Sequence, residues 1–323
     1  MHIDLKLGLS CNNACIHCIM EPVRKLLLRE RKHIDASPDA VEDIIRTLTE
    51  RGIDSVTLTG GEPTLRGDFF TLLERLCQLD IAVTVQTNGR LLGGEKAAER
   101  LRALSDRRIL FVVALHGSEA ALHDAITRVR GSFDETAHAV HILHDLGFRV
   151  CGKMVLSRRN VNAVADTLDA MASLRMEEAI VAFPHAEGFT TEALGRVVPR
   201  YAEVRRALAG LSLSSGLHHH VFWETIPFCQ LPGPDFYVRS VDLDFLRERL
   251  HRQSTCIEMS MTGQHINWEE SRKSIKAKGK ACSSCLLDRV CEGVWEEYLP
   301  LHGESDLEPV TDMNRIRAFL ERL

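Results

Sequence analysis

Several features are missing from this sequence, and each absence narrows the class of protein. No run of apolar residues approaches the length of a membrane span, and no signal peptide precedes the first expected strand. The formal net charge is −5, so charge alone does not indicate a nucleic-acid-binding protein. There is no internal repeat and no low-complexity tract. A chain of 323 residues with 45% hydrophobic residues is long enough for one large domain and one smaller domain.

Cysteine, in contrast, is plentiful. Ten cysteines in a chain without a secretion signal indicate a reducing compartment and metal binding, not disulfides. We therefore expect a cytoplasmic protein. Basic residues gather in two short segments, 24–32 and 272–280, which we interpret as solvated faces.

Short apolar strands alternate with amphipathic helices over the first part of the chain. Ser37 and Pro38, for example, provide an N-cap and a first-turn proline for a helix that Gly52 ends. Such alternation predicts a parallel sheet. The six expected strands cover residues 2–9, 54–59, 82–87, 109–115, 148–156 and 179–183. Later in the chain, His218-His219-His220 would suit a metal site, but consecutive histidines on a strand point to alternate faces, so we interpret this segment as a partly exposed strand.

Three cysteines follow the first expected strand with the spacing C-x3-C-x2-C: Cys11, Cys15 and Cys18. Closed iron–sulfur sites use four cysteines, so three on one loop would leave one iron of a cubane cluster open to a further ligand. Open metal positions are where chemistry takes place. A zinc site is the alternative, although the next cysteine, Cys77, lies on an expected helix.

A second motif, Gly60-Gly61-Glu62, follows the next expected strand. Two glycines at a strand end allow a sharp turn and a close approach to a ligand. A carboxylate beside them can accept hydrogen bonds from an ammonium group.

Together these two motifs resemble the radical S-adenosylmethionine (SAM) superfamily. The resemblance implies an α/β fold with a partial (β/α)6 TIM-type barrel. It also implies that SAM binds the open iron of a 4Fe–4S cluster and is reductively cleaved to a 5′-deoxyadenosyl radical, which abstracts a hydrogen from the substrate. Gly60, Gly61 and Glu62 would then form the site for the SAM amino group.

Further residues follow from position and from the resemblance. Asn88 lies at a strand end, where it could contact SAM or substrate. Many relatives have serine at the position of Ala114, so Arg128 or Lys153 is a candidate to hold the SAM carboxylate here. No general acid or base can be chosen from the sequence; the candidates are His116, Lys153, His185 and Glu187.

The C-terminal cysteines Cys282, Cys285 and Cys291 need a fourth ligand to close a site, either Cys229 or the alternative Cys256. Zinc and a 4Fe–4S cluster are both chemically compatible with this set. The segment resembles the shortened SPASM ("twitch") domain of radical SAM enzymes, which carries one auxiliary 4Fe–4S cluster. We therefore expect three parts: a core barrel over residues 1–190, a bridging region over 191–255 and a small cysteine-rich domain over 256–323.

The resemblance implies an oxidoreductase that uses its auxiliary cluster in oxidation or crosslinking. Its substrate would be a small metabolite or a ribosomal peptide, and a flavodoxin- or ferredoxin-type protein would supply electrons. Two alternatives stay open. The first is a redox-neutral epimerase, mutase or lyase with a structural C-terminal metal site. The second is an iron–sulfur protein that binds or transfers electrons without catalysis.

Overall fold

The computed structural model describes residues 2–186, 189–211, 217, 220–233, 236, 257–259, 265–267 and 274–320. In this part of the chain the main sheet has nine strands in the order β7-β6-β5-β4-β3-β2-β1-β8-β9. All neighbouring pairs from β7 to β8 are parallel, and β9 pairs antiparallel with β8. The strands are β1 (His2–Lys6), β2 (Ser55–Thr59), β3 (Ala82–Thr87), β4 (Ile109–Ala114), β5 (Arg149–Val155), β6 (Glu178–Ala182), β7 (Val221–Glu224), β8 (Ile257–Met259) and β9 (His265–Asn267).

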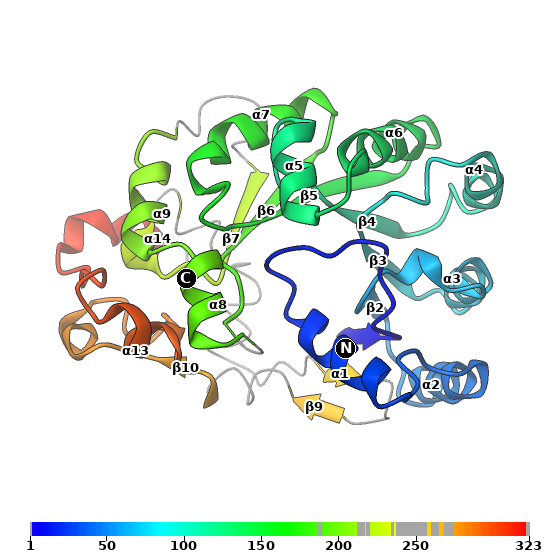
Figure 1. The fold of residues 1–323 in the computed structure, drawn as a ribbon, viewed down its shortest axis with the longest axis horizontal. Coiled ribbons are helices and arrows are strands. Elements are labelled where there is room, and N and C mark those ends of the chain that lie inside the picture. Colours follow the sequence, from blue (N-terminus) through cyan, green and yellow to red (C-terminus); the bar gives the residue numbers. More distant parts are fainter. Residues whose placement is uncertain are drawn as a thin grey trace.

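The sheet is curved, and most helices lie along its outer side (Figure 1). The partial TIM-type barrel predicted from the sequence is thus confirmed. All six predicted strands are present, but the parallel series continues through β7. In β7 Val221 and Trp223 are buried while Phe222 is 40% exposed, as expected for a partly exposed strand. The neighbouring His218 and His219 lie outside the described residues.

The helix predicted to begin at Ser37 and Pro38 is present as α2. In α2 the Ser37 hydroxyl accepts a hydrogen bond from Ala40 N at 3.2 Å, and the apolar face is buried. The main helices are α1 (Met20–Arg29), α2 (Pro38–Glu50), α3 (Phe69–Gln78), α4 (Glu95–Arg102), α5 (Ala120–Thr127), α6 (Ser132–Asp145), α7 (Val164–Ser173), α8 (Thr191–Val197) and α9 (Tyr201–Leu208).

The C-terminal part consists of short elements that lie beside α8 and α9 (Figure 1). Strands β10 (Lys276–Ala277) and β11 (Val294–Trp295) form a two-stranded antiparallel sheet. Helices α13 (Tyr298–His302) and α14 (Arg317–Leu320) follow. The division into three parts at residues 190 and 255 stays a prediction. No helix among the described residues has both the length and the apolar character needed to cross a bilayer.

The first strand is shorter than predicted, and this difference places the site. Strand β1 ends at Lys6, and the next residues leave the sheet to pair with the segment before α2. Leu9 N donates to Ile34 O at 2.8 Å, and Ala36 N donates to Leu7 O at 2.9 Å. The chain therefore crosses the carboxyl edge of the sheet before it reaches Cys11, and this edge is where barrel folds place their active sites.

Candidate functional site

The loop from Cys11 to Cys18, here called the cysteine loop, is fixed by the end of α5. Ala14 N donates to Thr127 O at 3.0 Å, and Ile16 N donates to Ile126 O at 2.9 Å. These ladder-like contacts join residues far apart in the sequence. The loop is therefore held by the barrel and not by its own conformation.

The three thiols of the cysteine loop lie close enough together to affect one another. Burial, together with the neighbouring Cys18 and Cys11, raises the pKa of Cys15 to about 12. Burial also raises the pKa of Cys11. Three adjacent thiolates are unfavourable without a compensating cation, so this donor set fits a metal cluster.

Only glycine fits at positions 60 and 61, because the backbone of residues 8–10 lies directly against them. Gly60 has φ +120°, and a Cβ on it would lie 2.4 Å from Gly8 O. A Cβ on Gly61 would lie 2.1 Å from Ser10 O. Gly61 N donates to Gly8 O at 2.8 Å, and Glu62 N donates to Ser10 O at 2.7 Å. The glycines thus hold the segment that leads directly into Cys11.

The Glu62 carboxylate lies in a dense set of hydrogen bonds. Its Oε1 accepts from Thr64 N at 3.1 Å, from Thr64 Oγ1 at 2.7 Å and from Thr87 Oγ1 at 2.6 Å. Its Oε2 accepts from Asn88 N at 2.7 Å. Burial raises the pKa of Glu62 even though these bonds oppose the shift. Since each carboxylate oxygen has two lone pairs, Oε2 can accept one more donor, which an ammonium group would supply.

Asn88 and Arg90 connect the end of β3 to the cysteine loop. Asn88 Nδ2 donates to Asn12 Oδ1 at 2.7 Å. Arg90 Nη1 donates to Asn12 O at 2.6 Å and to Asn13 Oδ1 at 2.9 Å. Sequence reasoning missed Arg90, although its place directly after the Asn88-Gly89 strand end was a usable signal.

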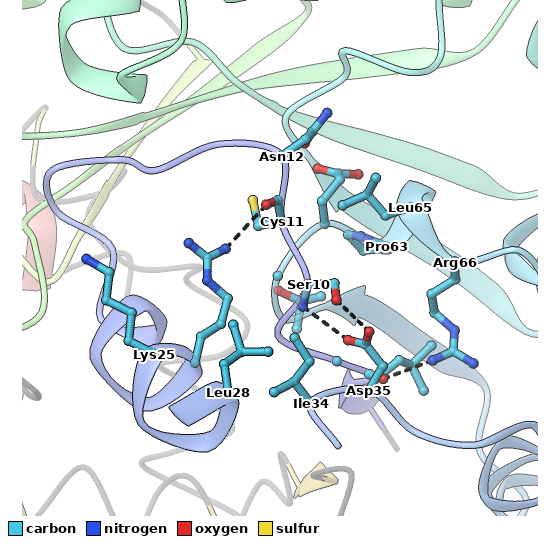
Figure 2. A pocket seen from close by; sticks show the side chains of 16 residues that line it. Ser10, Cys11, Asn12, Lys25, Leu28, Ile34, Asp35, Pro63, Leu65 and Arg66 are labelled. Carbon is cyan, nitrogen blue, oxygen red and sulfur yellow. Dashed lines mark hydrogen bonds between the residues drawn. The ribbon is translucent and has the colours of Figure 1, made fainter. Parts of the chain in front are cut away.

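A cavity of about 700 Å³ opens beside Cys11. Residues of the cysteine loop, of α1 and of the Gly61-Glu62 turn line it. Figure 2 shows Cys11 and Asn12 of the loop and Lys25 and Leu28 of α1. Asp35 holds the backbone that leads to Cys11: its Oδ1 accepts from Leu9 N at 3.0 Å and from Ser10 N at 3.1 Å. Arg24 reaches Cys11 O from α1 at 3.4 Å. The cavity is therefore bordered by a thiol, a carboxylate and basic side chains.

The two residues predicted to hold the SAM carboxylate, Lys153 and Arg128, have different surroundings. Lys153 pairs with Ala114 in the β4–β5 register, and its Nζ lies 2.7 Å from Glu224 Oε2. Arg128 has φ +58° at the end of α5, and its side chain is exposed. Neither residue is among those that line the cavity beside Cys11, so the role suggested by Ala114 stays a prediction for both.

Of the candidate acid–base residues, His116 is buried next to the cysteine loop. A ligand atom of His116 lies within 4.8 Å of those of Cys15 and His17. The ring of His185 has its centroid 4.3 Å from that of Trp295, so His185 lies against the C-terminal part. Glu187 lies outside the described residues. His17, which the sequence analysis did not single out, has a pKa lowered to about 4 by burial and by His123.

The second group of cysteines forms one pocket. Cys229 comes from the 3-10 helix η4 (Phe228–Gln230), and it lines the same cavity as three cysteines near the C-terminus: Cys282, Cys285 and Cys291. We call this the C-terminal cysteine pocket. Burial and the neighbouring Cys291 raise the pKa of Cys229 to about 12. The alternative ligand Cys256 lies outside the described residues.

Hydrogen-bond donors point at the sulfur atoms of this pocket. Val310 N lies 3.4 Å from Cys285 Sγ, and Gly293 N lies 3.4 Å from Cys291 Sγ. Gln230 Nε2 lies 3.1 Å from Cys229 Sγ. Donors of this kind stabilise thiolates, so the pocket fits a metal or cluster with four thiolate ligands.

Comparison with known proteins agrees with this geometry. The profile described as the radical SAM superfamily matches residues 5–171. The chain belongs to the radical SAM superfamily. The mycofactocin maturase MftC of Mycolicibacterium smegmatis is 33% identical over 170 residues, which are 52% of this chain and 40% of that protein. The AdoMet-dependent heme synthase of Nitratidesulfovibrio vulgaris is 28% identical over 162 residues, which are 49% of this chain and 41% of that protein. The matched segment thus spans less than half of either relative.

Solved structures of the radical SAM fold extend the likeness over nearly the whole chain. SuiB of Streptococcus suis bound to S-adenosylmethionine superposes with a TM-score of 0.64 and 19% identity, covering 97% of this chain and 76% of that chain. The anSMEcpe structure with bound AdoMet and the Cp18Cys peptide gives a TM-score of 0.61 and 14% identity, covering 99% and 96%. At these identities the likeness shows the fold.

Proposed function

We propose that this radical SAM enzyme carries two 4Fe–4S clusters and oxidises or crosslinks a peptide substrate. The observation that carries the proposal is the gathering of thiols at two separate places. Three lie on a loop beside a cavity, and four line one pocket. Three thiols leave a coordination position for a further ligand, whereas four close a site.

In this proposal Cys11, Cys15 and Cys18 hold the SAM-binding cluster. When bound, this cluster and SAM supply the radical that abstracts hydrogen from the substrate. Glu62 and the backbone of the Gly60-Gly61 turn bind the SAM amino group. Support comes from the remaining acceptor position on Glu62 Oε2 and from the placement of this carboxylate in the wall of the cavity.

Cys229, Cys282, Cys285 and Cys291 hold the auxiliary cluster. The proposal favours Cys229 over Cys256 because Cys229 shares the cavity with the other three cysteines. A cluster there supplies an acceptor for the electron that remains after hydrogen abstraction. The chain contributes a closed set of thiolates and the N–H donors that stabilise them.

The peptide substrate is favoured by the relatives. SuiB has been solved bound to its precursor peptide SuiA, anSMEcpe has been solved with bound peptides, and MftC is a maturase. A small metabolite is the alternative substrate. Incubation of the reduced enzyme with each substrate class distinguishes them: we expect 5′-deoxyadenosine formation to rise with a peptide that loses two hydrogens, measured by mass spectrometry.

An acidic flavodoxin- or ferredoxin-type protein is the proposed electron donor, and α1 is its proposed docking helix. The helix follows the cysteine loop and exposes apolar side chains, with Leu26 and Leu28 each 54% exposed. Arg29 and Arg31 add positive charge in a protein of net charge −5. An Arg29→Glu/Arg31→Glu variant should be reduced more slowly by flavodoxin and at the normal rate by dithionite. Equal flavodoxin rates would reject this surface.

The decisive experiment for the two-cluster proposal is metal analysis with Mössbauer spectroscopy of the anaerobically reconstituted protein. About eight irons per chain, all in 4Fe–4S clusters, are expected. About four irons with one zinc would make the C-terminal site structural and favour the redox-neutral alternative. Absence of 5′-deoxyadenosine under strong reductant would instead favour a protein that only binds or transfers electrons.

A further inference from the structure

Two tyrosines lie together between the barrel and the C-terminal cysteine pocket. The ring of Tyr201, at the start of α9, has its centroid 4.4 Å from that of Tyr298 and 4.2 Å from that of Phe183. Both tyrosines are at most 2% exposed. Their hydroxyl groups, however, have different surroundings.

The hydroxyl of Tyr298 has its hydrogen bonds satisfied by the protein. It donates to Asp306 Oδ2 at 2.6 Å and accepts from Tyr201 N at 2.8 Å. Arg200 supports the same carboxylate from Nε at 3.1 Å and from Nη2 at 3.0 Å. This hydroxyl therefore joins α9 to the C-terminal part and has a structural role.

The hydroxyl of Tyr201 is different, because it is buried without a hydrogen-bond partner among the described residues. Tyr201 itself is 0% exposed. An orphaned buried hydroxyl is costly and needs an explanation, such as a group that the protein binds.

The surroundings of Tyr201 include the element that contains Cys229, because helix α9 packs against η4. Hydrogen bonds lead from Tyr298 through Asp306 to Gln230, whose Nε2 donates to Asp306 O at 2.7 Å and to Cys229 Sγ at 3.1 Å. Burial raises the pKa of Tyr201 well above its ordinary value, with Tyr298, Cys229 and Cys291 adding to the rise, so the phenol keeps its proton.

We propose that the Tyr201 hydroxyl donates a hydrogen bond to a sulfur of the group held in the C-terminal cysteine pocket and thereby raises its reduction potential. The inference rests on the proposed function, which places a 4Fe–4S cluster there. A donor aimed at sulfur stabilises the additional negative charge of the reduced cluster. Tyr201 is thus a positioning and tuning residue that acts from the barrel side. The backbone donors Gly293 and Val310 act from the C-terminal side.

The test is a potentiometric titration, followed by EPR, of the holoenzyme and of Tyr201→Phe. The signal to follow is the one that does not change when SAM is added. The variant removes one hydroxyl and leaves no orphaned group. At a fixed potential near the midpoint, we expect the ratio of reduced to oxidised auxiliary cluster to fall about two- to tenfold, the worth of one hydrogen bond.

Tyr298→Phe is the matched control, because it removes a hydroxyl from the adjacent ring whose partners are Asp306 and a backbone N–H. We expect it to lower stability and to leave the potential near that of the parent enzyme. An unchanged potential in Tyr201→Phe, or equal shifts in both variants, would overturn the inference.

A second measurement covers the case in which Tyr201→Phe loses its cluster. Incorporation of 3-fluorotyrosine keeps every hydroxyl, and pulsed electron–nuclear double resonance then detects fluorine near the reduced auxiliary cluster. The chain has three tyrosines, so the measurement uses the Tyr237→Phe/Tyr298→Phe variant, in which Tyr201 is the one tyrosine left. A coupling that persists in this variant places Tyr201 at the cluster, and its absence rejects the inference. If the parent enzyme holds about four irons and one zinc, the proposed function and this inference both fail. If it holds about eight irons and the potential does not move, only the role of Tyr201 fails.

Discussion

The cysteine loop and the C-terminal cysteine pocket gather thiols in two different ways. The cysteine loop carries three thiols within eight residues and borders a cavity of about 700 Å³. The C-terminal cysteine pocket joins Cys229 to three cysteines that follow it by more than fifty residues, and N–H groups point at its sulfurs. The cysteine loop leaves room for a ligand beside its thiols, whereas the four cysteines of the C-terminal cysteine pocket line a single small cavity.

The way each region is held explains this difference. The cysteine loop is attached through its backbone. Ala14 N and Ile16 N donate to the end of α5, Asn12 O accepts from Arg90 Nη1, and the Cys11 side of the loop borders the cavity. In the C-terminal cysteine pocket, donors are directed at the sulfurs of Cys229, Cys285 and Cys291. In the cysteine loop, Asn13 N is directed at Cys11 Sγ at 3.4 Å. A loop fixed through its backbone suits a site that must admit a substrate, whereas a pocket fixed through its ligands suits electron storage.

The largest effect is expected from removing the three thiols of the cysteine loop. In the Cys11/Cys15/Cys18→Ala variant, SAM cleavage should fall to background while iron falls from about eight to about four per chain. Cys151→Ala is the control, since Cys151 is a buried thiol outside both groups and should leave both values unchanged. Full SAM cleavage by the triple variant, measured as 5′-deoxyadenosine, would refute the assignment of this loop.

A smaller and more selective effect is expected from the C-terminal cysteine pocket. Cys282→Ala should retain part of the SAM cleavage but yield no oxidised or crosslinked product, because the electron acceptor is lost. Product and 5′-deoxyadenosine are measured in the same reaction. A normal product yield would remove the auxiliary cluster from the reaction and make the two regions independent.

Gly61→Ala tests how the cysteine loop is attached. Its new Cβ would meet Ser10 O at 2.1 Å, so the backbone on one side must move. We expect a loss of roughly 1 to 3 kcal/mol in the free energy of unfolding and weaker cluster binding, measured by urea denaturation and iron content. Gly67→Ala is the matched control, because a Cβ there meets nothing within 4 Å. Equal losses in both variants would show that close approach is not the cause.

The smallest effect is expected from Arg90→Met, which keeps the apolar stem but loses the bonds to Asn12 and Asn13. Iron should leave the cysteine loop several times faster in the presence of a chelator, since two part-buried hydrogen bonds are worth about 1 to 3 kcal/mol together. Glu135→Gln breaks only the outer ion pair of Arg90, whose carboxylate side is 48% exposed, and should have little effect. Identical chelation rates in Arg90→Met and the parent would show that the loop does not depend on Arg90.

Much of the barrel could be predicted from the sequence because its patterns are local. Alternating apolar residues define β1 and β3, and Ser37-Pro38 define the start of α2. The place of β7 in the sheet could not be predicted in this way. It has four residues, and only its pairing with β6 makes Val221 and Trp223 part of the core.

The sequence by itself determined the superfamily, because the spacing of Cys11, Cys15 and Cys18 and the Gly60-Gly61-Glu62 turn are short motifs. Only the tertiary structure decided which distant groups meet. It brought Cys229 into the C-terminal cysteine pocket, Arg90 onto the cysteine loop and the Tyr201 hydroxyl into a buried position where no described residue is its hydrogen-bond partner. Contacts between residues so far apart depend on how the strands and helices pack, and no local pattern of residues encodes that packing.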